Sequence, residues 1–347
     1  MIAPLDELLA QMQPHLPRVL VSEYSFARAM EIARVLPDIS GGICLECRLG
    51  RGDSRVDFII CALAQDGGRE AFPVDPPTPL SSPLWERVFA FCKEWRNPAS
   101  MLHTRIPMIW LEFDMDESAS PILRPLPFAC IQPWIARGPP GRRDPMAQLE
   151  DQGRTLAWRS LELLGEHLLT SSIERTVSAC FEQLPDGAHL MHLAPLTSRK
   201  MEAVRVVASL HKNHVPNYLS RLGWPGSSLQ VKEILEHRLE FWNHVDINVD
   251  VQESVLPDVG FGWQLSDIPN DPRTRLLLDG LVEDGLCDPE KRDALLQWPG
   301  REEAVLNDNQ WPSTLCRTLG FKLVHRHGAP IEAKAYLYFE NRFSLLS

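Results

Sequence analysis

The sequence predicts an α+β protein: a closed antiparallel β-barrel of ten strands, made of five hairpins and surrounded by helices. Strand-like runs come in five adjacent pairs with helical stretches between the pairs, and polar and apolar residues alternate in most runs. Such alternation places one strand face against apolar groups. Short links favour antiparallel hairpins, because a parallel crossover needs about a dozen or more residues. The predicted pairs are 43–49 with 56–64, 107–115 with 121–131, 187–196 with 202–210, 244–252 with 257–266, and 318–326 with 332–341.

Helical spacing appears before and between these hairpins. Residues 5–12 and 25–35 carry apolar side chains three and four positions apart, which is typical of amphipathic helices. The stretch 83–92 begins with a proline after two serines, a common helix start. Longer helical stretches are predicted at 146–183, 228–243 and 273–298, the last broken near Asp288.

A single domain over residues 1–347 is predicted. The chain is long enough for two domains, but barrels commonly exceed the usual domain length. Proline-rich loops at 73–79 and 138–141 do not interrupt the rhythm of strand, strand and helix. Neither loop therefore marks a domain linker.

Composition and charge exclude several classes of partner. The net charge of −11 argues against nucleic acid or an anionic membrane as the main partner. No apolar run approaches the roughly 20 residues that span a bilayer, and the stretch from Met1 to Glu7 lacks the features of a secretion signal. Of the eight cysteines only Cys44 and Cys47 are close in sequence, and no zinc ligand set accompanies them. We therefore expect free thiols and a cytoplasmic location.

The polar faces of the strands supply the candidate site residues. If the apolar faces pack outward on helices, the alternate residues line a central chamber. The same pattern is also typical of a half-buried sheet that exposes its polar face to solvent. Carboxylates on one face, such as Glu112 and Asp114, repel each other unless a cation, a metal or a proton lies between them. The residues predicted to face the chamber are Glu46, Arg48, Trp110, Glu112, Asp114, Asp246, Asn248, Asp250, Lys322, Lys334, Tyr336 and Tyr338.

Histidines offer weaker candidates. His189 and His192 lie on one predicted strand and are expected to point to opposite faces, which excludes a joint metal site. His211 and His214 have a spacing that suits a metal on a helix, but no third ligand is evident, so a surface pair is the simpler interpretation.

The order helix, strand, strand, helix, repeated five times, resembles the ABBA or PT-barrel prenyltransferases. The first hairpin is most similar to the cyanobactin-type peptide prenyltransferases of natural-product biosynthesis. Topology carries the resemblance over nearly the whole chain, with a local match at Ile43-Cys44-Leu45-Glu46-Cys47-Arg48 and a second at Lys334-Ala335-Tyr336-Leu337-Tyr338.

The resemblance implies a prenyltransferase without an organic cofactor, acting on a prenyl diphosphate and a peptide, aromatic or cationic acceptor. Glu46 matches the family's strand-borne glutamate that acts on the acceptor. Lys334 and Tyr336 match the Lys-x-Tyr strand that holds the diphosphate, and Lys322 is expected to help. Cations stabilise a departing diphosphate, and aromatic faces attract the allylic cation that it leaves.

Several positions that carry cations in the resembling family are acidic in this sequence. Two explanations stay open: the chamber favours a cationic acceptor such as an arginine- or amine-bearing one, or it holds Mg²⁺ against the diphosphate. A different function also stays open, namely a barrel without a diphosphate site that binds or modifies another peptide or cationic ligand. Three or more converging Lys or Arg side chains would favour the transferase.

Overall fold

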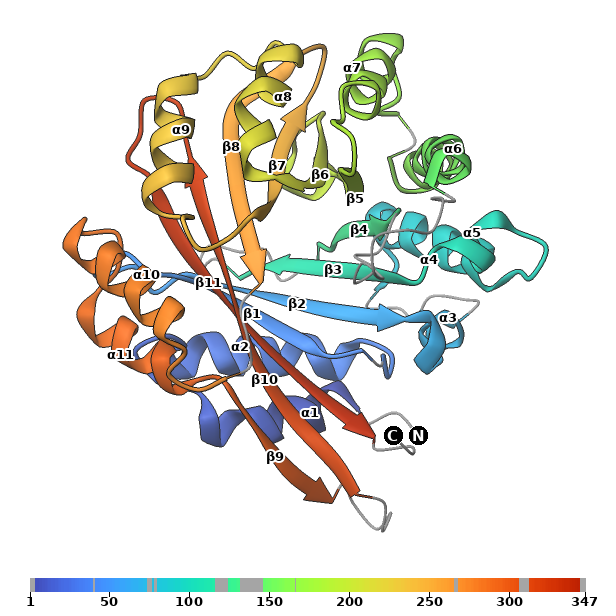
Figure 1. Cartoon of the computed structure of the whole chain (residues 1–347). Helices are drawn as coiled ribbons and strands as arrows, with labels where there is room; N and C mark the ends of the chain where they lie inside the picture. The colour runs from blue at the N-terminus through green and yellow to red at the C-terminus, as the bar shows by residue number, and fades with distance from the viewer. Residues whose placement is uncertain are drawn as a thin grey trace.

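A closed antiparallel barrel forms the centre of the protein (Figure 1). The computed structural model describes residues 4–39, 41–73, 77, 80–115, 124–131, 146–165, 167–264, 268–305 and 312–343. The strands are β1 (Ile43–Arg48), β2 (Val56–Leu63), β3 (Met108–Asp114), β4 (Leu126–Cys130), β5 (His189–Pro195), β6 (Val204–His211), β7 (His244–Val251), β8 (Val255–Gln264), β9 (Gly300–Val305), β10 (Pro312–His325) and β11 (Glu332–Phe343).

Strand order confirms the predicted architecture. The sheet runs β11-β1-β2-β3-β4-β5-β6-β7-β8-β10-β9, and a further pairing of β10 with β11 closes a ring of ten strands. Each predicted hairpin is present, with antiparallel neighbours throughout. Parts of the predictions at 121–123, 138–141 and 265–266 lie outside the described residues.

One strand was not predicted. β9 pairs with residues 312–317, so β10 begins six residues before the predicted start at 318. The sequence of β9, Gly-Arg-Glu-Glu-Ala-Val, has consecutive charges where a half-buried strand would alternate. Its position next to β10 and outside the ring explains this composition, because neither face of β9 lines the barrel interior.

Helices lie on the outer side of the curved sheet (Figure 1). They are α1 (Leu5–Met12), α2 (Glu23–Val35), α3 (Gly68–Ala71), α4 (Pro83–Arg96), α5 (Met101–Arg105), α6 (Met146–Gly165), α7 (Ser171–Glu182), α8 (Val215–Arg221), α9 (Ser228–His237), α10 (Pro272–Glu283) and α11 (Pro289–Gln297). The predicted helix 146–183 is two helices, since the Thr170 side chain caps a new start by accepting from the backbone N–H of Ile173. The stretch 228–243 is helical only to His237. Among the described residues, no helix has the length and apolarity to cross a membrane.

The two faces of the barrel wall differ in chemistry. Outward residues such as Leu45, Phe58, Leu111, Ile247 and Leu337 are fully buried and join one core with the helices. Inward positions alternate with them, as the burial of β7 illustrates: its valines and isoleucine are buried, whereas the polar residues between them are partly accessible. The wall therefore presents its polar face to the interior, as predicted.

Candidate functional site in the barrel

All twelve residues predicted to face the chamber lie on the inner face of the wall. Strand register aligns them: Glu46 stands opposite Tyr336 on one side and Asp57 on the other, and Lys322 stands opposite Lys334. The side chains of Trp110, Tyr336, Tyr338 and Lys322 are only partly buried although the barrel surrounds them, so the interior keeps accessible space.

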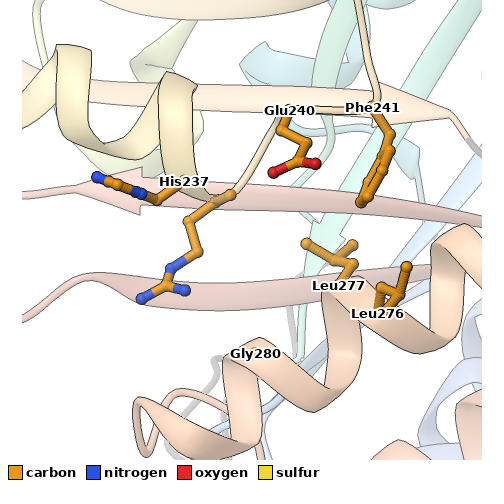
Figure 2. A pocket seen from close by; sticks show the side chains of 7 residues that line it. His237, Glu240, Phe241, Leu276, Leu277 and Gly280 are labelled. Atoms are coloured by element: carbon orange, nitrogen blue, oxygen red, sulfur yellow. The ribbon is translucent and has the colours of Figure 1, made fainter.

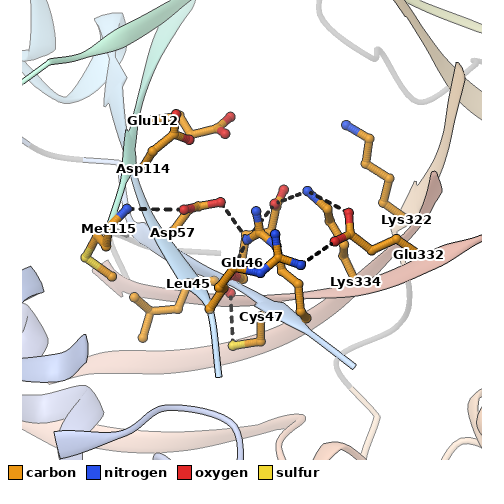
Figure 3. Close-up of polar contacts among 12 residues, drawn as sticks. Leu45, Glu46, Cys47, Asp57, Glu112, Asp114, Met115, Lys322, Glu332 and Lys334 are labelled. Carbon is orange, nitrogen blue, oxygen red and sulfur yellow. Dashed lines mark hydrogen bonds and ion pairs between the residues drawn. The ribbon is translucent and has the colours of Figure 1, made fainter. Parts of the chain in front are cut away.

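Glu46 is the centre of a charged network (Figure 3). Its Oε1 accepts from Lys334 Nζ at 2.7 Å and lies 3.1 Å from Arg48 Nη1. Burial alone would raise the pKa of Glu46, but Lys334 and Arg48 outweigh burial and hold the pKa well below its usual range. In the free protein Glu46 is thus an ionised carboxylate and a weak base.

Asp57 belongs to the same network and was not predicted. Its Oδ2 lies 2.5 Å from Arg48 Nη1. Burial, then the nearby charge of Glu46, raises the pKa of Asp57 to about 7 despite Arg48. The sequence hid this residue because the next inward positions on β2, Ile59 and Cys61, are apolar, so the strand reads as a continuous apolar run.

Arg199 supplies the cation that Glu112 and Asp114 require. It is the last residue of the 3₁₀ helix Leu196–Arg199, and its guanidinium bonds to Glu112 and, at 2.6 and 2.9 Å, to Asp114. Burial would raise the pKa of Asp114, but Arg199 outweighs it and lowers the pKa. No strand pattern could reveal Arg199, because it lies in the link between β5 and β6.

Arg205 on β6 was also missed. Its Nε and Nη2 bond to the two carboxylate oxygens of Asp250 at 2.8 and 2.9 Å. Arg205 is the one charged residue in a run of β-branched and small residues. Its place in the alternation of inward and outward positions along β6 could have identified it as an inward residue. The pair holds the pKa of Asp250 low, against the opposite effect of burial.

Lys322 differs from these cations. Its Nζ donates to Asn248 Oδ1 at 2.9 Å, and no carboxylate of the described residues lies within ion-pair distance of it. Burial, then the nearby charge of Arg205, lowers the pKa of Lys322 to about 7. Its stem passes over Gly260, where an added Cβ would stand 2.5 Å from Lys322 Cε. Glycine at that position lets the amine reach the interior.

Aromatic rings line the wall beside Glu46. Tyr336 and Tyr338 stack with ring centroids 6.0 Å apart, and Trp110 meets Tyr338 edge to face at 6.3 Å. Burial, then the charge of Glu46, raises the pKa of the Tyr336 hydroxyl. Cys44 faces this side too, and burial raises the pKa of its thiol, so it stays neutral.

Three buried carboxylates approach the geometry of a metal site. Oxygens of Glu46, Asp57 and Glu112 lie within 4.8 Å of one another, the one such group among the described residues. Carboxylate oxygens suit Mg²⁺. However, Arg48 bonds to Glu46 and Asp57, and Arg199 bonds to Glu112, so guanidinium groups already supply the positive charge there. These residues do not fit a protein-held metal while the arginines remain in place.

The prediction for His189 and His192 is wrong. A bulge between Leu190 and His192 shifts the register, so that His189 stands opposite Ser209 and His192 opposite Val207. Both partners are inward positions, and both histidines therefore face the interior. Burial, then His189, lowers the pKa of His192 to about 4, which keeps it neutral at physiological pH.

Two hollows lie away from this network. A small one of about 40 Å³ lies between the end of α9 and α10, where Phe241 and Leu276 are exposed (Figure 2). A larger one of about 340 Å³ lies where β2 ends and β3 begins, lined by Leu63, Arg69 and Met108 among others. Neither contains a predicted site residue.

No protein-family model matches the chain, and no curated protein matches it in sequence.

Proposed function

We propose that this chain transfers a prenyl group from an allylic diphosphate to a peptide, or to an aromatic or cationic small molecule, inside the barrel. The observation that carries the proposal is the convergence of cations from separate elements on the inner wall. They are Arg48 from β1, Arg199 after β5, Arg205 from β6, Lys322 from β10 and Lys334 from β11. Three or more converging Lys or Arg side chains favour the transferase, and these five meet that criterion.

Lys322 is the side chain best placed to receive the diphosphate. It is the inward cation that no described carboxylate neutralises, and Arg205 and Lys334 are near enough to lower its pKa. An arriving diphosphate would supply the missing negative charge and raise the fraction of Lys322 that is protonated. When the allylic carbon–oxygen bond breaks, its electron pair leaves with the diphosphate, and these cations stabilise that developing charge.

The aromatic wall suits the other product of ionisation. An allylic carbocation is attracted to the faces of Trp110, Tyr336 and Tyr338, which lie beside Glu46. The neutral thiol of Cys44 adds no charge to this surface.

Glu46 completes the reaction by accepting a proton. In the free protein Lys334 is the largest charge that lowers the pKa of Glu46. If Lys334 turns to the diphosphate, the Glu46 pKa rises, because the opposing burial effect remains. The carboxylate then takes the proton that the acceptor atom releases as it bonds to the allylic carbon. Donor binding would thus make Glu46 a competent base.

Mass spectrometry tests the proposal directly. The chain is incubated with dimethylallyl, geranyl or farnesyl diphosphate and a panel of peptides and aromatic amines, with and without Mg²⁺. We expect an acceptor heavier by one prenyl group and stoichiometric release of diphosphate. No adduct with any donor would contradict the proposal.

The alternative is a barrel that binds or modifies another peptide or cationic ligand. It is favoured by the ion pairs that neutralise Arg48, Arg199, Arg205 and Lys334. Titration calorimetry with inorganic diphosphate separates the two functions. Binding that Lys322→Met weakens at least tenfold supports the transferase, whereas no binding to the wild-type chain favours the alternative.

A further inference from the structure

Asp246 differs from the other acidic groups on the inner wall. Glu46, Asp57, Glu112 and Asp250 each contact an arginine or a lysine. Within the described part of the chain, Asp246 contacts no Lys or Arg, and its side-chain partner is the hydroxyl of Ser209. Burial raises the pKa of Asp246 to about 6, so the group is mostly ionised at neutral pH. A partly buried carboxylate without a counter-charge is costly to keep.

Space is left beside this carboxylate. Gly262 on β8 is the cross-strand partner of Asp246. An added Cβ at Gly262 would meet nothing closer than the Asp246 backbone oxygen at 3.6 Å and the Phe321 oxygen at 3.7 Å. Gly262 thus leaves an unfilled position beside Asp246, with room for a methyl group at ordinary van der Waals distance, which we call the recess. The equivalent position over Gly260 is instead filled by the stem of Lys322.

An aromatic surface adjoins the recess. An added Cβ at Gly320 on β10 would stand 3.0 Å from Tyr338 Cε2 and 3.5 Å from the backbone oxygen of Trp263, the residue after Gly262, so the Tyr338 ring lies over β10 close to β8. The nearby charge of Asp246 also raises the pKa of the Tyr338 hydroxyl, after the larger effects of burial and Cys44. Its ring contacts those of Tyr336 and Trp110. The aromatic rings therefore lie near both Glu46 and the recess.

We propose that Asp246, the recess at Gly262 and the ring of Tyr338 bind an organic cation of the acceptor, either a guanidinium or an ammonium group. Such a cation supplies the counter-charge that Asp246 lacks, and the aromatic face adds a cation–π attraction. A planar guanidinium meets a carboxylate with two parallel hydrogen bonds and also stacks on aromatic rings, so it is expected to bind more tightly than an ammonium. That this cation belongs to the acceptor rests on the proposed function, but its binding needs no transfer step.

The test measures binding without a prenyl donor. Calorimetry compares N-acetyl-arginine amide with its neutral isostere N-acetyl-citrulline amide, and N-acetyl-lysine amide with N-acetyl-norleucine amide. We expect each cation to bind the wild-type chain at least tenfold more tightly than its neutral partner. Asp246→Asn should abolish this preference. Glu303→Gln, which removes the same charge from an exposed position on β9, should keep it.

Equal binding of cationic and neutral ligands to the wild-type chain would overturn the inference, as would a preference that survives in Asp246→Asn. If Asp246→Asn fails to fold, Gly262→Ala fills the recess and should reduce the preference; an unchanged preference counts against the site. Cation binding without prenyl transfer would refute the proposed function and leave this inference standing. Equal prenylation of the arginine and citrulline ligands would refute this inference and leave the proposed function standing.

Discussion

The two ends of the barrel interior use charge in different ways. Toward the Arg48 and Lys334 pair of β1 and β11, acids and bases contact one another directly. Around the Tyr338 ring the neighbours are mainly thiols and aromatic rings, and Asp246, whose charge acts on the Tyr338 hydroxyl, is an acid without a described cation. The acids of the first end are neutralised by their own ion pairs. At the second end Asp246 lacks a cationic partner, which a ligand could supply.

The largest expected effect is at the charged end. Glu46→Gln keeps the shape and removes the charge, so we expect turnover to fall by about two to four powers of ten. Losing one partner of a buried ion pair costs about 3–5 kcal/mol; we expect the lower value, because Arg48 keeps Asp57. Steady-state kinetics and urea unfolding measure the two effects. Turnover near that of the wild type would remove Glu46 as the base.

The same substitution at two inward aspartates of β7 should have opposite effects on stability. Asp250 has a lowered pKa in the folded state, so its contribution is present above the unfolded value of about 4 and is lost as pH falls through the folded pKa. Asp246 has a pKa raised to about 6. Its contribution to the free energy of unfolding is therefore present below about pH 4 and is lost as pH rises from about 4 to about 6. At pH 7 we expect Asp250→Asn to destabilise the protein and Asp246→Asn to stabilise it. Urea unfolding from pH 4 to pH 8 checks this, and parallel curves for the two variants would contradict the comparison.

Lys322 should leave a signature at alkaline pH. Its folded pKa of about 7 is below the unfolded value of about 10.4, so the unfolded chain binds more protons between them. The free energy of unfolding should therefore rise with pH across that window. Lys322→Met should lack this rise and, in the presence of donor, should show a higher KM. Identical pH dependence in the two proteins would mean that the amine is not desolvated.

The smallest effects distinguish two glycines on β8. Gly260→Ala displaces the flexible end of Lys322 and brings the new Cβ to 3.3 Å from Asn248 Cβ, so we expect a cost at the lower end of overpacking, about 1 kcal/mol. Gly262→Ala meets only ordinary contacts and should change stability by less than about 1 kcal/mol. Chemical denaturation of both variants gives the comparison. Equal losses would show that the path of Lys322 does not depend on Gly260.

The sequence predicted the barrel and the inward residues because both follow from local alternation. Residues such as Glu112 and Asp246 have apolar neighbours on each side, so the sequence shows directly which strand face each one occupies. The partners were not local. Arg199 lies 85 positions from Asp114 in a link without periodicity, and only the closed sheet brings them together.

Interruptions of the pattern caused the errors. Asp57 was hidden because the inward face of β2 is mostly apolar, and β9 was missed because its charges are consecutive. A bulge in β5 reversed the parity of one histidine, which no count of alternating residues can anticipate. Where the strands were regular, the prediction succeeded.

Closure of the barrel by β1 and β11 has a consequence for how the protein folds. The ion pair of Glu46 with Lys334 joins residues 288 positions apart, across the seam where β1 meets β11. Such distant contacts form slowly, because closing a long loop costs conformational entropy before any stabilising contact is made. During synthesis β1 must wait, with one edge unpaired, until β11 has emerged. The charged network is thus a late product of folding, and intermediates that expose this edge are the species most prone to aggregate.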